Sequence, residues 1–199
     1  MTDVHDRPGA AIADGPGEVE AGANQSPAWG SADWAEGHLA ATLARWAINH
    51  ELLACDPALA DTAAFCEAYG IDRADSANTI IVAAKENPPR YVACVLLATC
   101  RLDVNRVVRT RLGTRKVSFA TAEETRQLTG MEIGGVCPIG LPDGLAIWVD
   151  AAVMTRQRIV LGGGSRRLKL ALEPIQLQRV PGLTVVEGLA QVLARDGQP

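Results

Sequence analysis

The sequence predicts an α+β protein with a twisted, mixed and largely antiparallel sheet flanked by short helices. Two observations lead to this prediction. Runs rich in apolar and β-branched residues pair across short turns that contain Pro or Gly, and short segments with helix-capping residues separate them. A chain of 199 residues is long enough for one domain with its own core. We therefore expect residues 31–199 to form a single domain.

The first 30 residues differ in composition from the rest of the chain. Gly, Ala, Pro, Asp and Glu dominate residues 1–30, and branched apolar side chains are almost absent. Such a segment buries too little apolar surface to offset the entropy lost on ordering, so we predict a disordered acidic tail. No apolar stretch of a signal peptide is visible, and the apolar run at 91–100 is half as long as a membrane span. We expect a cytoplasmic protein with no membrane partner.

Two helices are expected before the first strands. Residues 31–50 place large apolar side chains on one helical stripe, and residues 61–70 carry an Asp cap and a Gly stop. The runs 77–85 and 90–100 are nearly continuously apolar, which is typical of central strands. The letters "ENPP" between them predict a hairpin with a proline-stiffened turn.

The second half of the chain alternates short helices and strands. Thr121 and Glu124 have the spacing of a capping box, and three glycines from Gly162 to Gly164 turn one hairpin. The elements expected here are a helix at 103–113, a strand at 116–120, a helix at 121–130, strands at 145–150, 157–164 and 167–172, a helix from Pro174, a strand at 184–187 and a terminal helix at 188–194.

Charge is unevenly distributed along the chain. Residues 1–75 carry thirteen acidic and three basic residues, whereas residues 76–199 carry ten acidic and sixteen basic residues. Six of the basic residues fall within 101–116. Clustered Arg and Lys displace counterions from a nucleic acid, which makes this segment a candidate phosphate-binding ridge. The alternative is a solvated helix face. The candidate nucleic-acid contacts are Arg101, Arg106 and Arg109.

Several classes of chemistry are poorly supported. The five cysteines include no CxxC pair, the three histidines are not clustered, and no P-loop or dinucleotide fingerprint is present. We therefore expect neither a metal nor a cofactor. Cys137 as a nucleophile would need a neighbouring base, and nothing in the sequence marks His38 or His50 as that base.

A glycine-rich stretch, "TGMEIGGVCPIGLPDG" at 129–144, is the main candidate for a functional loop. Gly134 and Gly135 can adopt backbone angles that aim their N–H groups at one point, and Pro138 fixes the loop exit. Convergent amides are what an oxyanion hole or a carbonyl-binding pocket requires. Asp150, at the end of the next strand, either orders a water or a ligand amine or caps a helix. The alternative for the whole stretch is a surface loop.

The order of the motifs "DTAAFCEAYGI", "TGMEIGGVCPIGLPDG", "IWVDAAV" and "IVLGGGSRRLKLAL" resembles the YbaK-like family, the prolyl-tRNA-synthetase-associated editing domains. The resemblance covers about residues 45–190. It implies an α+β fold and a trans-acting aminoacyl-tRNA deacylase, which cleaves the ester of a wrong amino acid without a metal. It also implies that the loop from Gly134 to Pro138 positions the ester and that the 2′-hydroxyl of the terminal adenosine assists.

One position departs from the family pattern. Members usually carry a lysine at the start of the first hairpin strand, where this chain has Asn78, and Lys169, Arg166 and Arg167 are candidates to replace the missing charge. The expected catalytic residues are Gly134, Gly135, Pro138, Asp150 and Asn78, and the expected substrate-binding residues are Thr79, Val136, Cys137, Gly163, Gly164 and Lys169.

The departure at Asn78 leaves two hypotheses open besides the deacylase. The protein is either the deacylase, with the acceptor end of aminoacyl-tRNA as its partner, or a non-catalytic module that binds aminoacyl-tRNA, a nucleotide or a protein. A weaker hypothesis is an accessory protein that docks on a synthetase or an elongation factor through residues 1–30.

Overall fold

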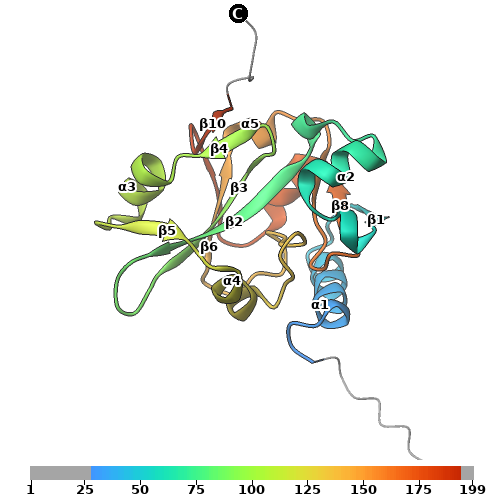
Figure 1. Ribbon diagram of the computed structural model, residues 1–199, viewed down its shortest axis with the longest axis horizontal. Coiled ribbons are helices and arrows are strands. Elements are labelled where there is room, and N and C mark those ends of the chain that lie inside the picture. The colour runs from blue at the N-terminus through green and yellow to red at the C-terminus, as the bar shows by residue number, and fades with distance from the viewer. Residues whose placement is uncertain (1–27, 194–199) are drawn as a thin grey trace, which may run out of the picture.

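The computed structural model describes residues 28–193 and contains a mixed sheet, a smaller antiparallel sheet and short helices around them (Figure 1). The predicted tail lies outside this range except for its last three residues. The α+β class with a mixed sheet is confirmed.

The larger sheet has five strands in the order β5-β2-β3-β6-β9. The strands are β2 (Ala77–Ala84), β3 (Tyr91–Leu97), β5 (Val117–Phe119), β6 (Ala146–Asp150) and β9 (Leu183–Val186). β2 runs antiparallel to β3 and β5, and β6 runs parallel to β3 and β9. The predicted hairpin of β2 and β3 is confirmed. β5 is short and pairs only with the last three residues of β2, so the first part of β2 has no β5 partner.

The smaller sheet has three antiparallel strands in the order β1-β8-β7. They are β1 (Glu51–Ala54), β7 (Ile159–Gly162) and β8 (Leu168–Leu172). The hairpin of β7 and β8 was predicted, and β1 was not. A bridge between Ser76 and Val160 joins β7 to the beginning of β2, so the two sheets meet at that point.

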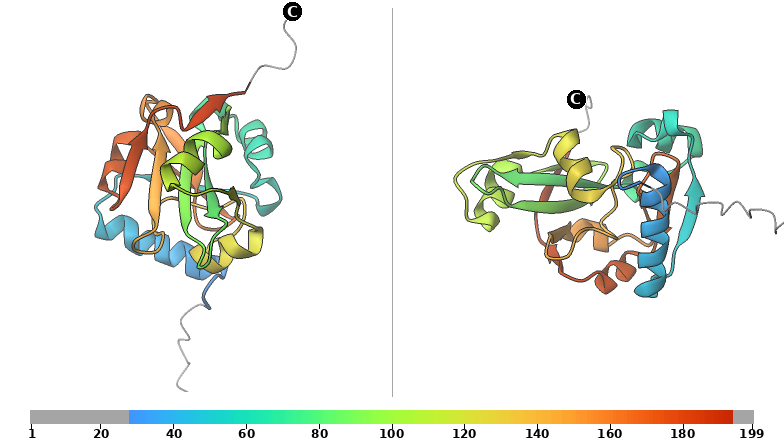
Figure 2. Two further views of the ribbon diagram at one scale, coloured as in Figure 1. Left: turned by 90° about the vertical axis from the view of Figure 1, so that its left-hand side faces the viewer. Right: turned by 90° about the horizontal axis from the view of Figure 1, so that it is seen from below.

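Helices begin and end near their predicted caps. The longer ones are α1 (Ala32–Arg45), α2 (Thr62–Tyr69) and α4 (Ala122–Thr129). The capping box of Thr121 and Glu124 is present in α4, and Gly70 and Gly130 end their helices in the left-handed region. The shorter ones are η1 (Pro57–Leu59), η2 (Arg73–Asp75), η3 (Val104–Val108), α3 (Arg109–Leu112), α5 (Ala151–Met154) and η4 (Pro174–Arg179). α1 is five residues shorter than predicted at its C-terminal end, and it lies beside the smaller sheet (Figure 2).

The predicted helix at 188–194 is wrong, because residues Ala190–Val192 form strand β10. β10 pairs antiparallel with β4 (Cys100–Leu102). A carboxylate oxygen of Asp150 accepts a hydrogen bond from the N–H of Ala190 at 2.8 Å and fixes the start of this strand. So short an apolar run has no decisive period, and partners distant in sequence decided its structure.

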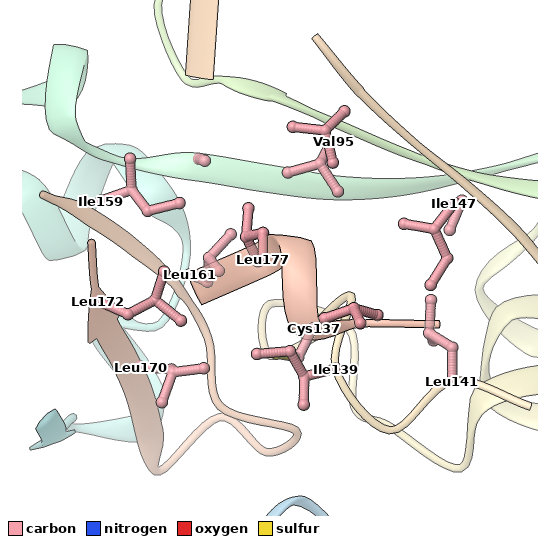
Figure 3. Close-up of a cluster of buried hydrophobic side chains, with 14 of the residues drawn as sticks. Val95, Cys137, Ile139, Leu141, Ile147, Ile159, Leu161, Leu170, Leu172 and Leu177 are labelled. Carbon is pink, nitrogen blue, oxygen red and sulfur yellow. The ribbon is translucent and has the colours of Figure 1, made fainter. Parts of the chain in front are cut away.

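The main core lies between the two sheets and the glycine-rich loop 129–144. Figure 3 shows its central side chains, with Cys137 and Ile139 of the loop packed against Leu161 and Leu170 of the smaller sheet and Leu177 of η4. The middle of the loop is therefore part of the core, and the alternative of a surface loop does not hold for it. A second cluster fills the opposite face of the larger sheet, under η3 and α3.

Candidate functional site

A pocket of about 280 Å³ lies where the two sheets meet. Its walls come from α2, the first half of β2, the loop around Gly134, and β7 and β8. Five of the predicted site residues line it: Asn78, Thr79, Gly134, Val136 and Lys169. These residues are up to 91 positions apart in the chain, so the fold brings them together.

Lys169 is the buried cation of this pocket. Its side chain projects from β8, only 5% of the residue is exposed, and its Nζ lies 5.2 Å from the centre of the Phe65 ring. The ammonium donates hydrogen bonds to the carbonyl oxygens of Ala60 at 2.6 Å and Gly134 at 2.8 Å. Burial lowers the pKa of the Lys169 ammonium below its ordinary value. An ammonium has three N–H donors, so one remains for a bound ligand.

Asn78 lies in the same pocket without a charge. Its Oδ1 accepts a hydrogen bond from the hydroxyl of Thr62 at 2.6 Å, which leaves the side-chain NH2 group to donate. Arg166 and Arg167, the other candidates for a replacement charge, do not line the pocket. Of the three candidates to replace the missing charge, Lys169 is therefore the one that lines the pocket.

Arg166 and Arg167 are held by contacts elsewhere. Arg166 forms an ion pair with Asp61 at 3.2 Å and donates to the carbonyl oxygen of Ile133 at 3.1 Å. Arg167 forms ion pairs with two carboxylates of α1, those of Asp33 and Glu36. These arginines fasten α1 and α2 to the loops behind the pocket.

Thr79 presents unpaired polar groups along the open edge of β2. The N–H of Ala120, the residue after β5, donates to the carbonyl oxygen of Ile81, so the backbone of Ile81 faces the edge of β2 that pairs with β5. Backbone groups alternate between the two edges of a strand, so those of Thr79 face the same edge as those of Ile81, beyond the end of β5. The hydroxyl of Thr79 is buried and has no hydrogen-bond partner among the residues that the structure describes. A buried hydroxyl without a partner is unusual, and a ligand in the pocket would satisfy it.

The glycine loop contributes a carbonyl and not the expected pair of amides. Gly134 has the predicted left-handed backbone, with φ at 91°, and its oxygen faces Lys169. The N–H of Gly135, however, donates to the carbonyl oxygen of Glu132 at 2.9 Å inside the loop. The predicted convergence of the Gly134 and Gly135 amides on one point is therefore incorrect.

The second glycine segment packs main chain against main chain on this loop. Gly162 lines the pocket, and a Cβ there would lie 2.4 Å from the carbonyl oxygens of Gly135 and Val136. Gly163 and Gly164 are buried behind the wall, where the N–H of Gly164 donates to the carbonyl oxygen of Gly135 at 2.7 Å. Gly163 and Gly164 therefore support the wall without touching the cavity.

Three more predicted residues lie outside the pocket. Cys137 is fully buried in the main core (Figure 3), and burial raises the pKa of its thiol to about 12, which disfavours a thiolate. Pro138 is buried next to it. Asp150 caps α5 through the N–H of Ala152 at 2.9 Å and binds Ala190 with its other oxygen. We leave all three out of the proposed site, because none of them lines the pocket.

Sequence reasoning missed several residues that line the pocket. Thr62 and Phe65 come from the face of α2 that covers Lys169, and Ile133 is 41% exposed at the pocket although it is large and apolar. Ile133 could have been found, because it directly precedes Gly134 in the quoted loop. No local pattern marks Thr62 or Phe65, which tertiary packing alone brings to the site.

Within residues 28–193, no group of His, Cys, Asp and Glu side chains is arranged to hold a metal ion. In the same range, no helix is long and apolar enough to cross a membrane.

Comparison with known proteins gives consistent matches. The family model of the aminoacyl-tRNA editing domain matches residues 56–180. The crystal structure of a hypothetical protein, APE2540, is 25% identical with a TM-score of 0.69, covering 77% of this chain and 99% of that one. A second crystal structure, of a proposed trans-editing enzyme for prolyl-tRNA synthetase, shares the fold with a TM-score of 0.67 at 19% identity, covering 77% and 95%. The match spans more than half of the sequence and includes every pocket residue discussed above, and the chain therefore belongs to the aminoacyl-tRNA editing domain family, the YbaK-like proteins.

Proposed function

We propose that the protein is a trans-acting deacylase that hydrolyses the ester between tRNA and a wrongly attached amino acid. The observation that carries the proposal is Lys169, a buried ammonium that contacts the Gly134 carbonyl and retains one donor in a pocket of the editing fold. Its partner would be the acceptor end of aminoacyl-tRNA, and its place would be translation quality control in the cytoplasm.

The chemistry follows from the groups that line the pocket. A water oxygen adds to the ester carbonyl carbon, and the carbonyl oxygen gains negative charge in the transition state. The remaining N–H of Lys169 and the side-chain NH2 of Asn78 are the donors for that oxygen. The C–O bond to the ribose then breaks, the ribose oxygen takes up a proton, and a free amino acid and tRNA are released.

The proton acceptor is expected to come from the substrate. Among the described residues, no carboxylate or imidazole lines the pocket. This composition supports the assistance by a ribose hydroxyl that the family resemblance implies. The unpaired Thr79 hydroxyl, Gly134 and Val136 would hold the aminoacyl group beside the donors.

A non-catalytic binding module remains the second candidate, because Asn78 brings no charge to the position where the family usually has a lysine. Such a module would hold aminoacyl-tRNA, a nucleotide or a protein partner in the same pocket without cleaving an ester.

The deciding experiment is deacylation of a panel of mischarged tRNAs, with cysteinyl- and alanyl-tRNA for proline first. The deacylase proposal expects at least one of them to lose its amino acid faster with the wild-type protein than with Lys169→Met or buffer. If every tRNA of the panel loses its amino acid at the buffer rate, the deacylase proposal fails and the binding module is favoured.

A further inference from the structure

A second hollow, of about 360 Å³, lies at the far side of β5 and is lined by Arg101, Leu102, Asp103, Val104, Asn105, Phe119 and Gln191. Its walls are β4, the start of η3, β5 and β10. β5 pairs with the end of β2, whereas β4 follows β3 near the start of β2 (Figure 1). We call this hollow the Phe119 groove.

Of the three arginines that the sequence marked as nucleic-acid contacts, one lines this groove and two bond to residues that line it. Arg101 lines it directly. Arg106 forms an ion pair with Asp103 at 3.0 Å, and Arg109 donates to the carbonyl oxygen of Asn105 at 2.7 Å. All three arginines are exposed, and one carboxylate accompanies them. The lining itself holds one arginine and one carboxylate, and the excess of positive charge comes from Arg106 and Arg109 beside it, which suits a phosphate backbone.

Phe119 is an exposed aromatic ring among these charges. The residue is 54% exposed although it sits in a strand of the main sheet. Its cross-strand partner is Val82, so the ring lies on the face of the sheet that carries the second core cluster. An exposed aromatic ring beside arginines is the arrangement on which proteins stack unpaired nucleobases.

The groove and the pocket are lined by consecutive residues at the end of β5. Phe119 lines the groove, and the next residue, Ala120, lines the pocket. Ile80 lines the pocket and lies two residues from Val82, on the same face of the sheet as Phe119. Ala120 packs on the main core, on the other face of the sheet, so the shared face runs from Phe119 to Ile80. A nucleic-acid strand that follows this face toward the pocket passes Phe119 before it reaches Ile80.

We propose that Phe119 stacks on an unpaired nucleobase next to the aminoacylated nucleotide, and that Arg101 and Arg109 hold the adjoining phosphates. The ligand is thus the single-stranded 3′ end of an RNA. Asn105, whose side chain makes no hydrogen bond to another described residue, is available for the edge of that base. The inference rests on the proposed function, since it assigns the nucleotides that precede the ester in the pocket.

The first experiment measures binding by fluorescence anisotropy of an uncharged RNA hairpin with a single-stranded 3′ end. We expect Phe119→Ala to weaken binding about 5- to 150-fold, the range for loss of one stacked base. Phe119→Tyr should bind within about threefold of wild type, and Phe119→Leu should resemble Phe119→Ala, because only an aromatic ring stacks. Ile175→Ala, a change at an apolar residue of η4 that is 53% exposed and lines neither the groove nor the pocket, is the matched control and should have no effect.

A second hairpin that lacks the unpaired nucleotides separates stacking from general attraction. Wild type and Phe119→Ala should bind this blunt hairpin equally weakly. Equal binding of the full hairpin by wild type and Phe119→Ala, or full affinity of Phe119→Leu, would overturn the stacking assignment.

Deacylation distinguishes this inference from the proposed function. An aminoacyl ester of adenosine alone should be cleaved by wild type and Phe119→Ala at the same rate, whereas aminoacyl-tRNA should show a raised KM in the variant. If Phe119 affects RNA binding while no ester is cleaved, the deacylase proposal fails and the groove stands. If esters are cleaved and Phe119 has no effect on binding or on KM, the groove assignment fails and the deacylase stands.

Discussion

Replacing Lys169 by Met tests the site most directly. Met has a similar length without a charge or a donor, so it fills the space below Phe65 while removing the ammonium. The variant loses one donor to the ester oxygen, and loss of one such donor lowers kcat by about 10²- to 10³-fold. We expect a decrease of that size in single-turnover deacylation of the best tRNA in the panel.

The stability of Lys169→Met should change little. The carbonyl oxygens of Ala60 and Gly134 lose their donor, at about 1–3 kcal/mol each. Removing a buried ammonium returns several kcal/mol of desolvation. These terms nearly cancel, so we expect a net change within about 2 kcal/mol, which is a Tm shift within about 8 °C for a domain of this size. Thermal unfolding followed by circular dichroism measures it.

Moving the positive charge to position 78 should restore the activity that Lys169→Met loses. The double variant Asn78→Lys with Lys169→Met carries an ammonium on β2, at the other wall of the same pocket. We expect it to recover activity to within about tenfold of wild type. Full activity of Lys169→Met at an unchanged Tm would refute the assignment of Lys169 as the donor.

Three further predictions concern pH, the strand position and the glycine wall. Burial lowers the pKa of Lys169 from its ordinary 10.5, so the ratio of enzymatic to spontaneous hydrolysis should fall as the pH rises toward that value. Because of the same lowering, the unfolded chain binds this proton more tightly than the folded chain does. Wild type should therefore gain stability relative to Lys169→Met as the pH rises through the folded-state pKa. Asn78→Lys alone should raise the deacylation rate from near zero if the native pocket only binds, and should leave robust activity unchanged if Lys169 already supplies the charge. Gly135→Ala should lower Tm by several degrees, because its Cβ would meet the carbonyl oxygen of Ser165 at 2.2 Å, whereas Gly37→Ala, with open space around it in α1, should keep or slightly raise Tm.

The sequence predicted the fold through local patterns and failed where distant contacts decided the outcome. The capping box of Thr121 and the β2–β3 hairpin depend on neighbouring residues, so both are confirmed. Ala190–Val192 form a strand through Asp150 and β4, contacts that no local window contains.

The candidate site divides in the same way. The sequence identified the glycine loop and Lys169 as candidate site residues, but it did not predict their hydrogen-bond partners. The N–H of Gly135 was expected to face a ligand, but it donates to the carbonyl oxygen of Glu132 within the loop. Asp150 was expected at the site, and its two oxygens are taken by Ala152 and Ala190. Sequence patterns identify groups able to act, whereas packing decides which of them face the cavity.

The contact between Gly162 and the carbonyl oxygens of Gly135 and Val136 bears on how this protein can diversify. A wall made of backbone cannot be reshaped by single side-chain substitutions, because any Cβ at Gly162 would collide with it. The adjustable part of the pocket is the set of side chains that line it, such as Ile80 and Ile133. If the pocket holds the ester as we propose, new amino-acid preferences would arise by point mutation at those positions, while the backbone wall stays unchanged.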